Sequence, residues 1–362
     1  MEKGVHSKIV SWSVLDKETV AKQKKRKTDF QYWGPTPKEA RQVAAAKNKS
    51  LISKTMSIQQ AVEKYVKDGM HIGFGGFVNT RVPTAILWHI IKKGVKDLTL
   101  TFTSHSICPE WIAGAMLVYP EHVSIKRVEL AWWGYEIIGI APLLRYLAAN
   151  EMIEMDDYTN YGIAARFKAG AMGIPFIPVR ENGGSDMELV NRGTMIQCPF
   201  SGENTYILPA CNPDLGIVHV QAADKYGNAR IFGPLCTCPE ISQAAAHTIL
   251  SCETIIDNTA IRRYPNLTEI PYLVVDAVCE QKFGSWPGAV YGEYWFDMKQ
   301  FLNFRSLCEE FHKTGNKDKL KAYYDEYFFG CDTWDDLIAK ILSPDQLVDL
   351  RKQDGGQPVI LS

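Results

Sequence analysis

The chain has 362 residues, of which 46% are apolar, so it is long enough to bury a large core in one or two domains. Its net charge of −1 is unevenly spread: residues 1–50 hold 12 Lys/Arg against 5 Asp/Glu, which is +7 and leaves −8 for the rest. We interpret this basic arm as a solvated segment lying on an acidic body or partner, in preference to a nucleic-acid-binding tail. No apolar run is long enough to span a bilayer and the N-terminus lacks the apolar core of a signal peptide, so we expect a cytoplasmic protein without membrane contact.

The nine cysteines are typical of reduced thiols, because their number is odd and they follow no disulfide framework. Cys236-Thr237-Cys238 has no matching second pair, which makes a zinc site unlikely on spacing. We therefore expect buried structural thiols and no bound metal.

The most distinctive stretch of the core is His71–Pro83, which follows an amphipathic helical pattern over 58–66. Met70–Phe74 reads as a short strand, Gly73, Gly75 and Gly76 come where it ends, and Pro83 opens a helix. A glycine-rich turn between strand and helix can present backbone N–H groups to a ligand beyond the strand ends. The spacing matches neither the dinucleotide-binding nor the P-loop motif, so we reject both, and a purely structural tight turn remains an alternative.

The remaining elements follow in chain order. We expect strands at 97–103, 123–128 and 130–133, a helix at 142–149, an acidic turn at 154–158, a helix at 161–171, an extended segment at 173–179, irregular structure over 187–212, a buried strand at 215–221, a turn and returning strand at 224–232, a helix at 241–246, strands at 248–252 and 273–279, an aromatic loop at 284–292, and helices from 298 to about 350.

Strands that alternate with helices over residues 57–280 predict an α/β fold with an open, mainly parallel sheet and helices on both faces. We divide the chain into a basic N-terminal arm (1–53), an α/β core (54–297) and a C-terminal helical cap (298–362).

As a set, several segments resemble the α subunit of heteromeric CoA-transferases of the glutaconate CoA-transferase type. The resemblance covers roughly residues 56–345 and leaves the N-terminal arm outside. It rests on Gly75-Gly76-Phe77 with Arg81 and Pro83, 173–179, 218–224 with Gly227-Asn228 and Arg230-Ile231, Ala244-Ala245, Thr248-Ile249, Cys252-Glu253, and 275–278 with Gly284, Pro287, Tyr291-Gly292 and Tyr294.

The resemblance implies a CoA-transferase (NagB-like) fold and an active site shared with a similar β subunit. It also implies a covalent route, in which a glutamate attacks an acyl-CoA thioester and a glutamyl-CoA thioester then passes CoA to a carboxylic acid. In this type of enzyme the glutamate belongs to the β subunit. The CoA thioester would be a substrate, and no cofactor would be bound permanently.

Within this resemblance, Gly75, Gly76, Phe77 and Val78 become candidates for lining the acyl-CoA pocket. Arg81 is a candidate for binding a substrate carboxylate, with a surface ion pair as the alternative. Ser104, His105 and Ser106 end a predicted strand and so point toward the same cleft, although a core or rim role for His105 is equally open.

Two glutamates compete as catalytic acids on this chain. Glu181 lies in a Glu-Asn-Gly setting that imitates the nucleophile motif of related β halves, but its late position favours a cleft-lining acid beside Asn182, Gly183 and Gly184.

Glu136 follows an aromatic segment in which Tyr135 is a candidate for substrate contact, and an apolar setting there would raise its pKa and suit acid–base catalysis. A surface or salt-bridged glutamate is the alternative. We predict that His219, in an apolar strand, is a core histidine whose ring nitrogens are hydrogen-bonded. For the aromatic residues 286–295 we expect one of two roles, binding of an apolar acyl group or packing against the β subunit.

We therefore predict the α subunit of an acyl-CoA:carboxylate CoA-transferase. Its expected partners are a β subunit of the same family, an acyl-CoA and a carboxylic acid, with neither nucleic acid nor membrane. One alternative is a hydrolase or decarboxylase of the same fold that opens a cyclic 3-oxoacyl-CoA with Glu136 or Glu181. Another is a non-catalytic CoA-ester-binding scaffold.

Overall fold

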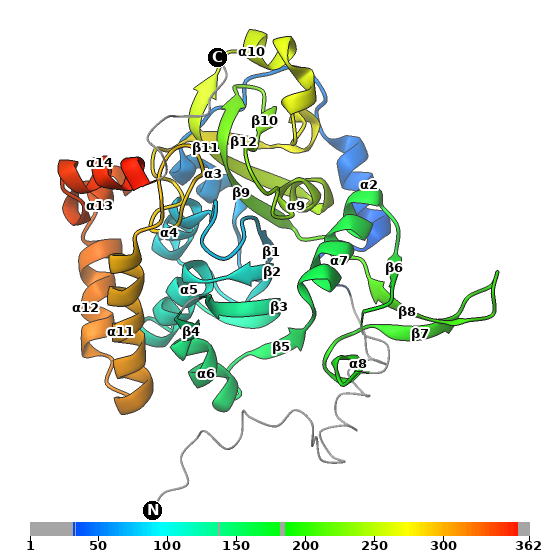
Figure 1. The fold of residues 1–362 in the computed structure, drawn as a ribbon, viewed down its shortest axis with the longest axis horizontal. Coiled ribbons are helices and arrows are strands. Elements are labelled where there is room, and N and C mark those ends of the chain that lie inside the picture. Colours follow the sequence, from blue (N-terminus) through cyan, green and yellow to red (C-terminus); the bar gives the residue numbers. More distant parts are fainter. Residues whose placement is uncertain (1–31, 33, 137, 182–184, 354–362) are drawn as a thin grey trace, which may run out of the picture.

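The computed structural model describes residues 32, 34–136, 138–181 and 185–353, and it confirms the predicted α/β fold (Figure 1). The central sheet runs in the order β12-β11-β9-β1-β2-β3, and β5 extends it by pairing with β3. These strands are all parallel, while β4 and β10 add short antiparallel pairs at β3 and β9. The strands are β1 (His71–Phe74), β2 (Leu98–His105), β3 (Ile125–Tyr135), β4 (Gly139–Ile140), β5 (Glu154–Asp157), β9 (Leu215–Asp224), β10 (Ala229–Arg230), β11 (His247–Ile256) and β12 (Ala277–Glu280).

Two apolar cores cover the two faces of this sheet. In β9, Leu215 and Ile217 join one core, while Val218 and Val220 join the other. Burial on both faces explains why β9 is almost continuously apolar. The first core takes helices α3 (Ile58–Tyr65), α4 (Thr84–Lys93), α5 (Ile107–Val118) and α6 (Pro142–Ala149), and the second takes α7 (Asn160–Met172) and α9 (Cys238–Ala244).

The prediction of irregular structure over 187–212 is wrong. This region holds α8 (Met187–Val190) and two strands, β7 (Thr194–Gln197) and β8 (Asn204–Pro209), which form a small antiparallel sheet with β6 (Phe176–Val179) in the order β6-β8-β7. In β8, Tyr206 and Leu208 enter the second core, whereas Ile207 between them is only half-buried. Burial limited to one face leaves a short alternating pattern that is easily read as a loop.

The acidic segment predicted as a turn is strand β5. Its carboxylates are paired: the Arg127 guanidinium contacts both Glu154 and Asp156, and Arg192 Nε donates to Asp156 Oδ2 at 2.6 Å. Pairing removes the cost of placing acidic side chains on a sheet edge.

The C-terminal helices are α11 (Met298–Thr314), α12 (Asp318–Tyr324), a π-helical turn (Asp325–Phe329), α13 (Trp334–Ile341) and α14 (Pro344–Gln353). They pack beside α4 and α5 and share the first core (Figure 1). The Trp111 ring of α5, for example, lies 5.2 Å from the Phe328 ring and 6.5 Å from the Trp334 ring, centroid to centroid.

Two further α-helices lie at the N-terminal side of the core and after β11. Helix α2 (Pro37–Ala46) precedes the core and begins with a capping box of Thr36 and Glu39, and α10 (Asn258–Arg263) follows β11. Among the described residues, no helix is both long and apolar enough to cross a membrane.

Candidate active site

The glycine turn lies after β1, at the carboxyl edge of the parallel sheet. Gly75 N–H donates to Ile217 O at 2.9 Å, and Gly76 N–H donates to the Cys238 thiol at 3.2 Å. A Cβ on Gly75 would come within 2.7 Å of a Val218 methyl group. Both glycines are buried, so their small size permits close packing against β9 and α9, and the expectation that their N–H groups face a ligand is not met.

The turn continues through two strained residues. Val78 and Arg81 adopt φ angles of 55° and 48°, which L-residues rarely occupy. Val78 N–H donates to Ser104 O, and Arg81 N–H donates to Ala289 O, each at 2.8 Å. The turn is therefore held in an unfavourable conformation by β2 on one side and by the chain around Ala289 on the other.

The predicted residues at the end of β2 are all fully buried. Ser104 Oγ donates to Asn160 Oδ1 at 2.8 Å, Ser106 Oγ lies 2.7 Å from Asn79 Oδ1, and His105 Nε2 lies 3.0 Å from Gly75 O. Burial lowers the pKa of His105 to about 3, so the ring is neutral and Nε2 can donate to that carbonyl. In this chain the three residues position the glycine turn, and the core role of His105 is the one observed.

An open cleft of about 410 Å³ lies beside the turn. One wall is the turn itself, and another comes from the chain that follows β12. The Thr80 hydroxyl joins the two walls by donating to the Tyr291 hydroxyl at 3.3 Å. The cleft is lined by Phe77, Val78, Asn79, Thr80, Glu136, Ala289, Tyr291, Trp295 and Phe296.

Of the predicted site residues, the cleft brings together Phe77, Val78 and Glu136. Glu136 is exposed, so the enclosed apolar setting expected around it is not present in this chain. Tyr135 is fully buried in the first core, where burial raises its pKa well above the usual range, and it is not among the residues that line the cleft.

The alternative of a surface ion pair for Arg81 is wrong, because its side chain is fully buried. The guanidinium donates to Pro234 O and lies beside the Cys236 thiol, outside the residues that line the cleft. Burial raises the pKa of Cys236 to about 11 and Arg81 opposes that rise. Arg81 as a ligand for a substrate carboxylate stays a prediction.

Glu181 follows β6 in the chain, and its side chain contacts the N-terminal end of α7. It is not among the residues that line the cleft. Its Oε2 accepts a hydrogen bond of 2.6 Å from Thr159 Oγ1, the N-cap residue of that helix. Burial raises the pKa of Glu181, and this hydrogen bond opposes the rise. Its predicted neighbours Asn182, Gly183 and Gly184 lie outside the described residues.

His219 is a satisfied core histidine, as predicted. Its Nδ1 lies 2.8 Å from Ser251 Oγ and its Nε2 lies 2.9 Å from Glu253 Oε1. Glu253 also accepts hydrogen bonds from the N–H groups of Phe283 and Gly284. This network joins β9, β11 and the start of the aromatic loop.

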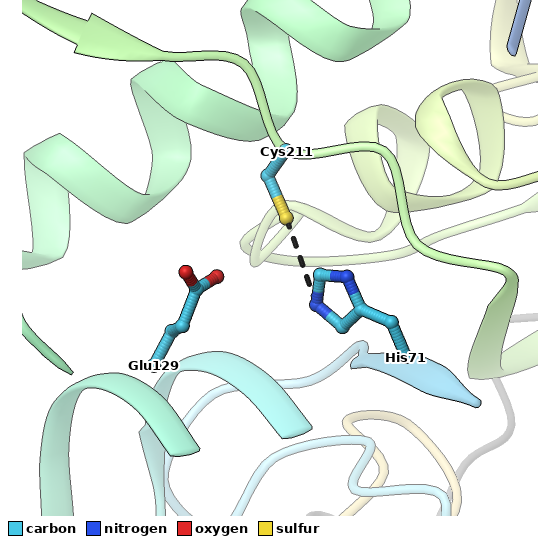
Figure 2. Close-up of side chains that lie close together, drawn as sticks. All are labelled: His71, Glu129 and Cys211. Carbon is cyan, nitrogen blue, oxygen red and sulfur yellow. Dashed lines mark hydrogen bonds between the residues drawn. The ribbon is translucent and has the colours of Figure 1, made fainter. Parts of the chain in front are cut away.

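A second cluster of side chains, which could in principle bind a metal ion, is buried away from the cleft lining. It consists of His71 of β1, Glu129 of β3 and Cys211, which precedes β9 (Figure 2). The atoms of these side chains that could bind a metal lie within 4.8 Å of one another. Arg166 Nη1 and Nη2, however, donate to both oxygens of Glu129 at 3.0 and 3.1 Å. Burial alone would raise the pKa of Glu129, but Arg166 and its other neighbours outweigh burial and bring it to about 2.

Burial also raises the pKa of Cys211 to about 12, which keeps the thiol protonated. Because the guanidinium already neutralises Glu129 and would repel a cation, these residues fit a buried structural network better than a metal centre. All nine cysteines of the chain are free thiols.

Residues 55–281 match the coenzyme A transferase family. The chain belongs to this family. An uncharacterized protein of Archaeoglobus fulgidus is 35% identical over 84% of this chain, which spans 66% of that protein. The α subunit of glutaconate CoA-transferase from Acidaminococcus fermentans is 29% identical, over 84% of this chain and 96% of its own length.

The crystal structure of glutaconate CoA-transferase from the same bacterium superposes with a TM-score of 0.75 at 27% identity, covering 82% of this chain and 95% of the other. A more distant CoA-transferase relative is the cholesterol ring-cleaving hydrolase IpdA subunit of Rhodococcus jostii, 26% identical over 64% of this chain and 80% of its own length. The predictions of a CoA-transferase family enzyme and of its α type are thus confirmed.

The sequence did not identify Asn79 and Thr80 as cleft residues. It also did not decide whether the aromatic loop binds an acyl group or packs against the β subunit. The available signal was Gly288, where a Cβ would come within 2.5 Å of Asn79 O. A glycine that another backbone approaches closely marks a contact, but the sequence does not reveal the partner.

Proposed function

We propose that this chain is the α subunit of an acyl-CoA:carboxylate CoA-transferase whose nucleophilic glutamate belongs to a partner β subunit. The observation that carries the proposal is the open cleft at the carboxyl edge of a CoA-transferase fold, half of it formed by the glycine turn. Glu181 is hydrogen-bonded to Thr159 outside this cleft, which supports a nucleophile supplied by the partner.

In the proposed reaction the partner's glutamate attacks the thioester carbonyl carbon and the C–S bond breaks, giving an acyl-glutamyl anhydride and CoA thiolate. The thiolate then attacks the glutamyl carbonyl, releasing the acid and leaving a glutamyl-CoA thioester. A second carboxylate takes CoA by the same two steps in reverse.

This chain would contribute binding and polarisation. In the described part of the chain, the N–H of Asn79 has no acceptor, and Asn79 lines the cleft. We assign this N–H as a donor to the oxygen on which charge develops during attack. The CoA thioester acts as substrate, without a resident cofactor, and we propose a cytoplasmic location.

The test is to incubate the complex of this chain with its partner with an acyl-CoA, reduce it with borohydride and analyse the peptides by mass spectrometry. Reduction of a glutamyl thioester to an alcohol lowers the mass of that glutamate by about 14 Da. We expect the modified peptide to come from the partner, with the same result in a Glu181→Gln control. A modified Glu181 or Glu136 peptide would refute our assignment of the nucleophile.

Glu136 favours one second candidate, a hydrolase or decarboxylase acting on a CoA ester, because it places a carboxyl group in the cleft. In that case the same experiment gives no modified glutamate in either chain, and free CoA or a ring-opened or decarboxylated CoA ester accumulates.

A further inference from the structure

The wall of the cleft that comes from the chain after β12 is a continuous row of aromatic rings. The Tyr291 and Trp295 ring centroids are 6.1 Å apart, those of Trp295 and Phe296 are 5.2 Å apart, and Phe296 lies 6.2 Å from Phe301 of α11. Phe301 is buried in the first core, and Trp295 N–H donates to Leu350 O of α14. These contacts fix the wall to the body of the protein.

Phe77 faces this region from the turn and is itself 36% exposed. An apolar group bound in the cleft would therefore meet aromatic rings from both the turn and the chain after β12. An apolar ligand gains binding free energy in such a site, because its apolar surface is removed from water. A polar ligand loses its hydrogen bonds to water there and finds few replacements on the aromatic rings.

The described side chains that line the cleft carry a negative charge and no positive one. Glu136 is the charged side chain among its lining residues, and none of the described lining residues is Lys, Arg or His. Arg81, which follows the turn, donates to Pro234 O and is not among the lining residues. A ligand with a carboxylate at the far end of its acyl group would meet Glu136 and no counter-charge among the described residues that line the cleft.

We infer that the cleft receives an apolar acyl group without a second carboxylate, of the arylalkanoyl class. This inference rests on the proposed function and deepens it. It separates this chain from glutaconate CoA-transferase, its relative named for a dicarboxylic acid. The aromatic wall supplies the affinity, and Glu136 rejects acyl groups that end in a carboxylate.

The test is equilibrium binding, by calorimetry, of 3-phenylpropanoyl-CoA and glutaryl-CoA to the complex of this chain with its partner. We expect 3-phenylpropanoyl-CoA to bind at least about tenfold more tightly. Glu136→Gln should tighten glutaryl-CoA binding and leave the aromatic ester unchanged. Trp295→Arg should reverse the preference, because it removes a ring and adds a cation.

Phe200→Ala is the matched control, since this ring is 97% exposed at the tip of the β7–β8 hairpin and should leave both affinities unchanged. Equal or tighter binding of glutaryl-CoA by the unaltered complex overturns this inference alone, and the glutamyl-CoA labelling still reports on the transferase. Binding of neither ester overturns both proposals. A preference that survives Trp295→Arg refutes the role of the aromatic wall.

Discussion

At the scale of single residues, the buried carboxyl group of Glu110 has a strongly shifted pKa. Glu110, in the first turn of α5, is fully buried, and its Oε1 accepts a long hydrogen bond of 3.4 Å from Leu144 N–H. Burial raises the pKa of Glu110 to about 8, and neighbouring hydrogen bonds, including one from Cys308, offset part of that rise. The side chain is thus protonated at neutral pH and becomes an uncompensated buried charge above it.

This residue predicts a pH-dependent stability. Because the folded-state pKa of about 8 lies above the unfolded value, the folded state binds the extra proton between these values, so stability falls as pH rises through that range. Glu110→Gln removes the ionisation, and at pH 9 it should raise the free energy of unfolding by roughly 2 kcal/mol or more.

Urea denaturation at pH 6 and pH 9 measures the effect. Glu121→Gln is the control, because the Glu121 side chain is 97% exposed. This variant should have the same free energy of unfolding as the unaltered protein at each pH. An equal pH dependence of the Glu110→Gln variant and the unaltered protein would show that Glu110 is not the source.

At the scale of elements, the site depends on contact between the glycine turn and the loop after β12. Ala289 N–H donates to Asn79 O at 2.6 Å, and Arg81 N–H donates back to Ala289 O at 2.8 Å. Gly288 allows this approach, because a Cβ there would lie within 2.5 Å of Asn79 O and 2.6 Å of a Val82 methyl group. The two cleft walls therefore hold each other in place.

Gly288→Ala should separate the walls. We expect a loss of stability of about 1–3 kcal/mol from overpacking and a weakening of acyl-CoA binding by at least about tenfold. Thermal unfolding and calorimetric binding measure the two effects.

Gly315→Ala serves for comparison, since Gly315 has a φ of 70° but nothing within 4 Å of a new Cβ. It should cost about 1 kcal/mol of stability and leave binding intact. Unchanged acyl-CoA binding by the Gly288→Ala variant would contradict the role of the contact.

At the scale of the whole molecule, the C-terminal helices belong to the first core. Trp88 Nε1 donates to Tyr327 O at 3.0 Å, and Lys92 of α4 contacts Cys331 O. In α5, Gly114 lies so close to the Tyr324 hydroxyl that a Cβ would collide with it. Helices that bury the rings of α4 and α5 support the scaffold on which the cleft is built.

Truncation after Asp297 should therefore expose Trp88 and Trp111 and prevent folding of the core. The expected result is a chain that is insoluble or lacks cooperative unfolding, as judged by near-ultraviolet circular dichroism and urea titration. Phe200→Ala, at a ring that is 97% exposed, is the control and should leave the unfolding midpoint unchanged. A soluble truncated core with the original midpoint would show that the helices are a separate unit.

The sequence alone determined the fold class, the strand–turn–helix around Gly75 and Gly76, and the buried strand β9, because short-range periodicity and glycine placement encode them directly. It did not reveal α5, which is buried on all sides and so has no polar face, or β7 and β8, whose alternation is short.

Only the tertiary structure decided which groups of the glycine turn remain available to a ligand. The N–H groups of Gly75 and Gly76 are used by β9 and α9, and the Thr80 hydroxyl meets Tyr291 across 211 residues of chain. Hydrogen-bond donors are satisfied by whatever the fold brings near, and sequence spacing does not encode those distant partners. The same reason explains why Glu136 lines the cleft while Glu181, in the more suggestive motif, lies outside it.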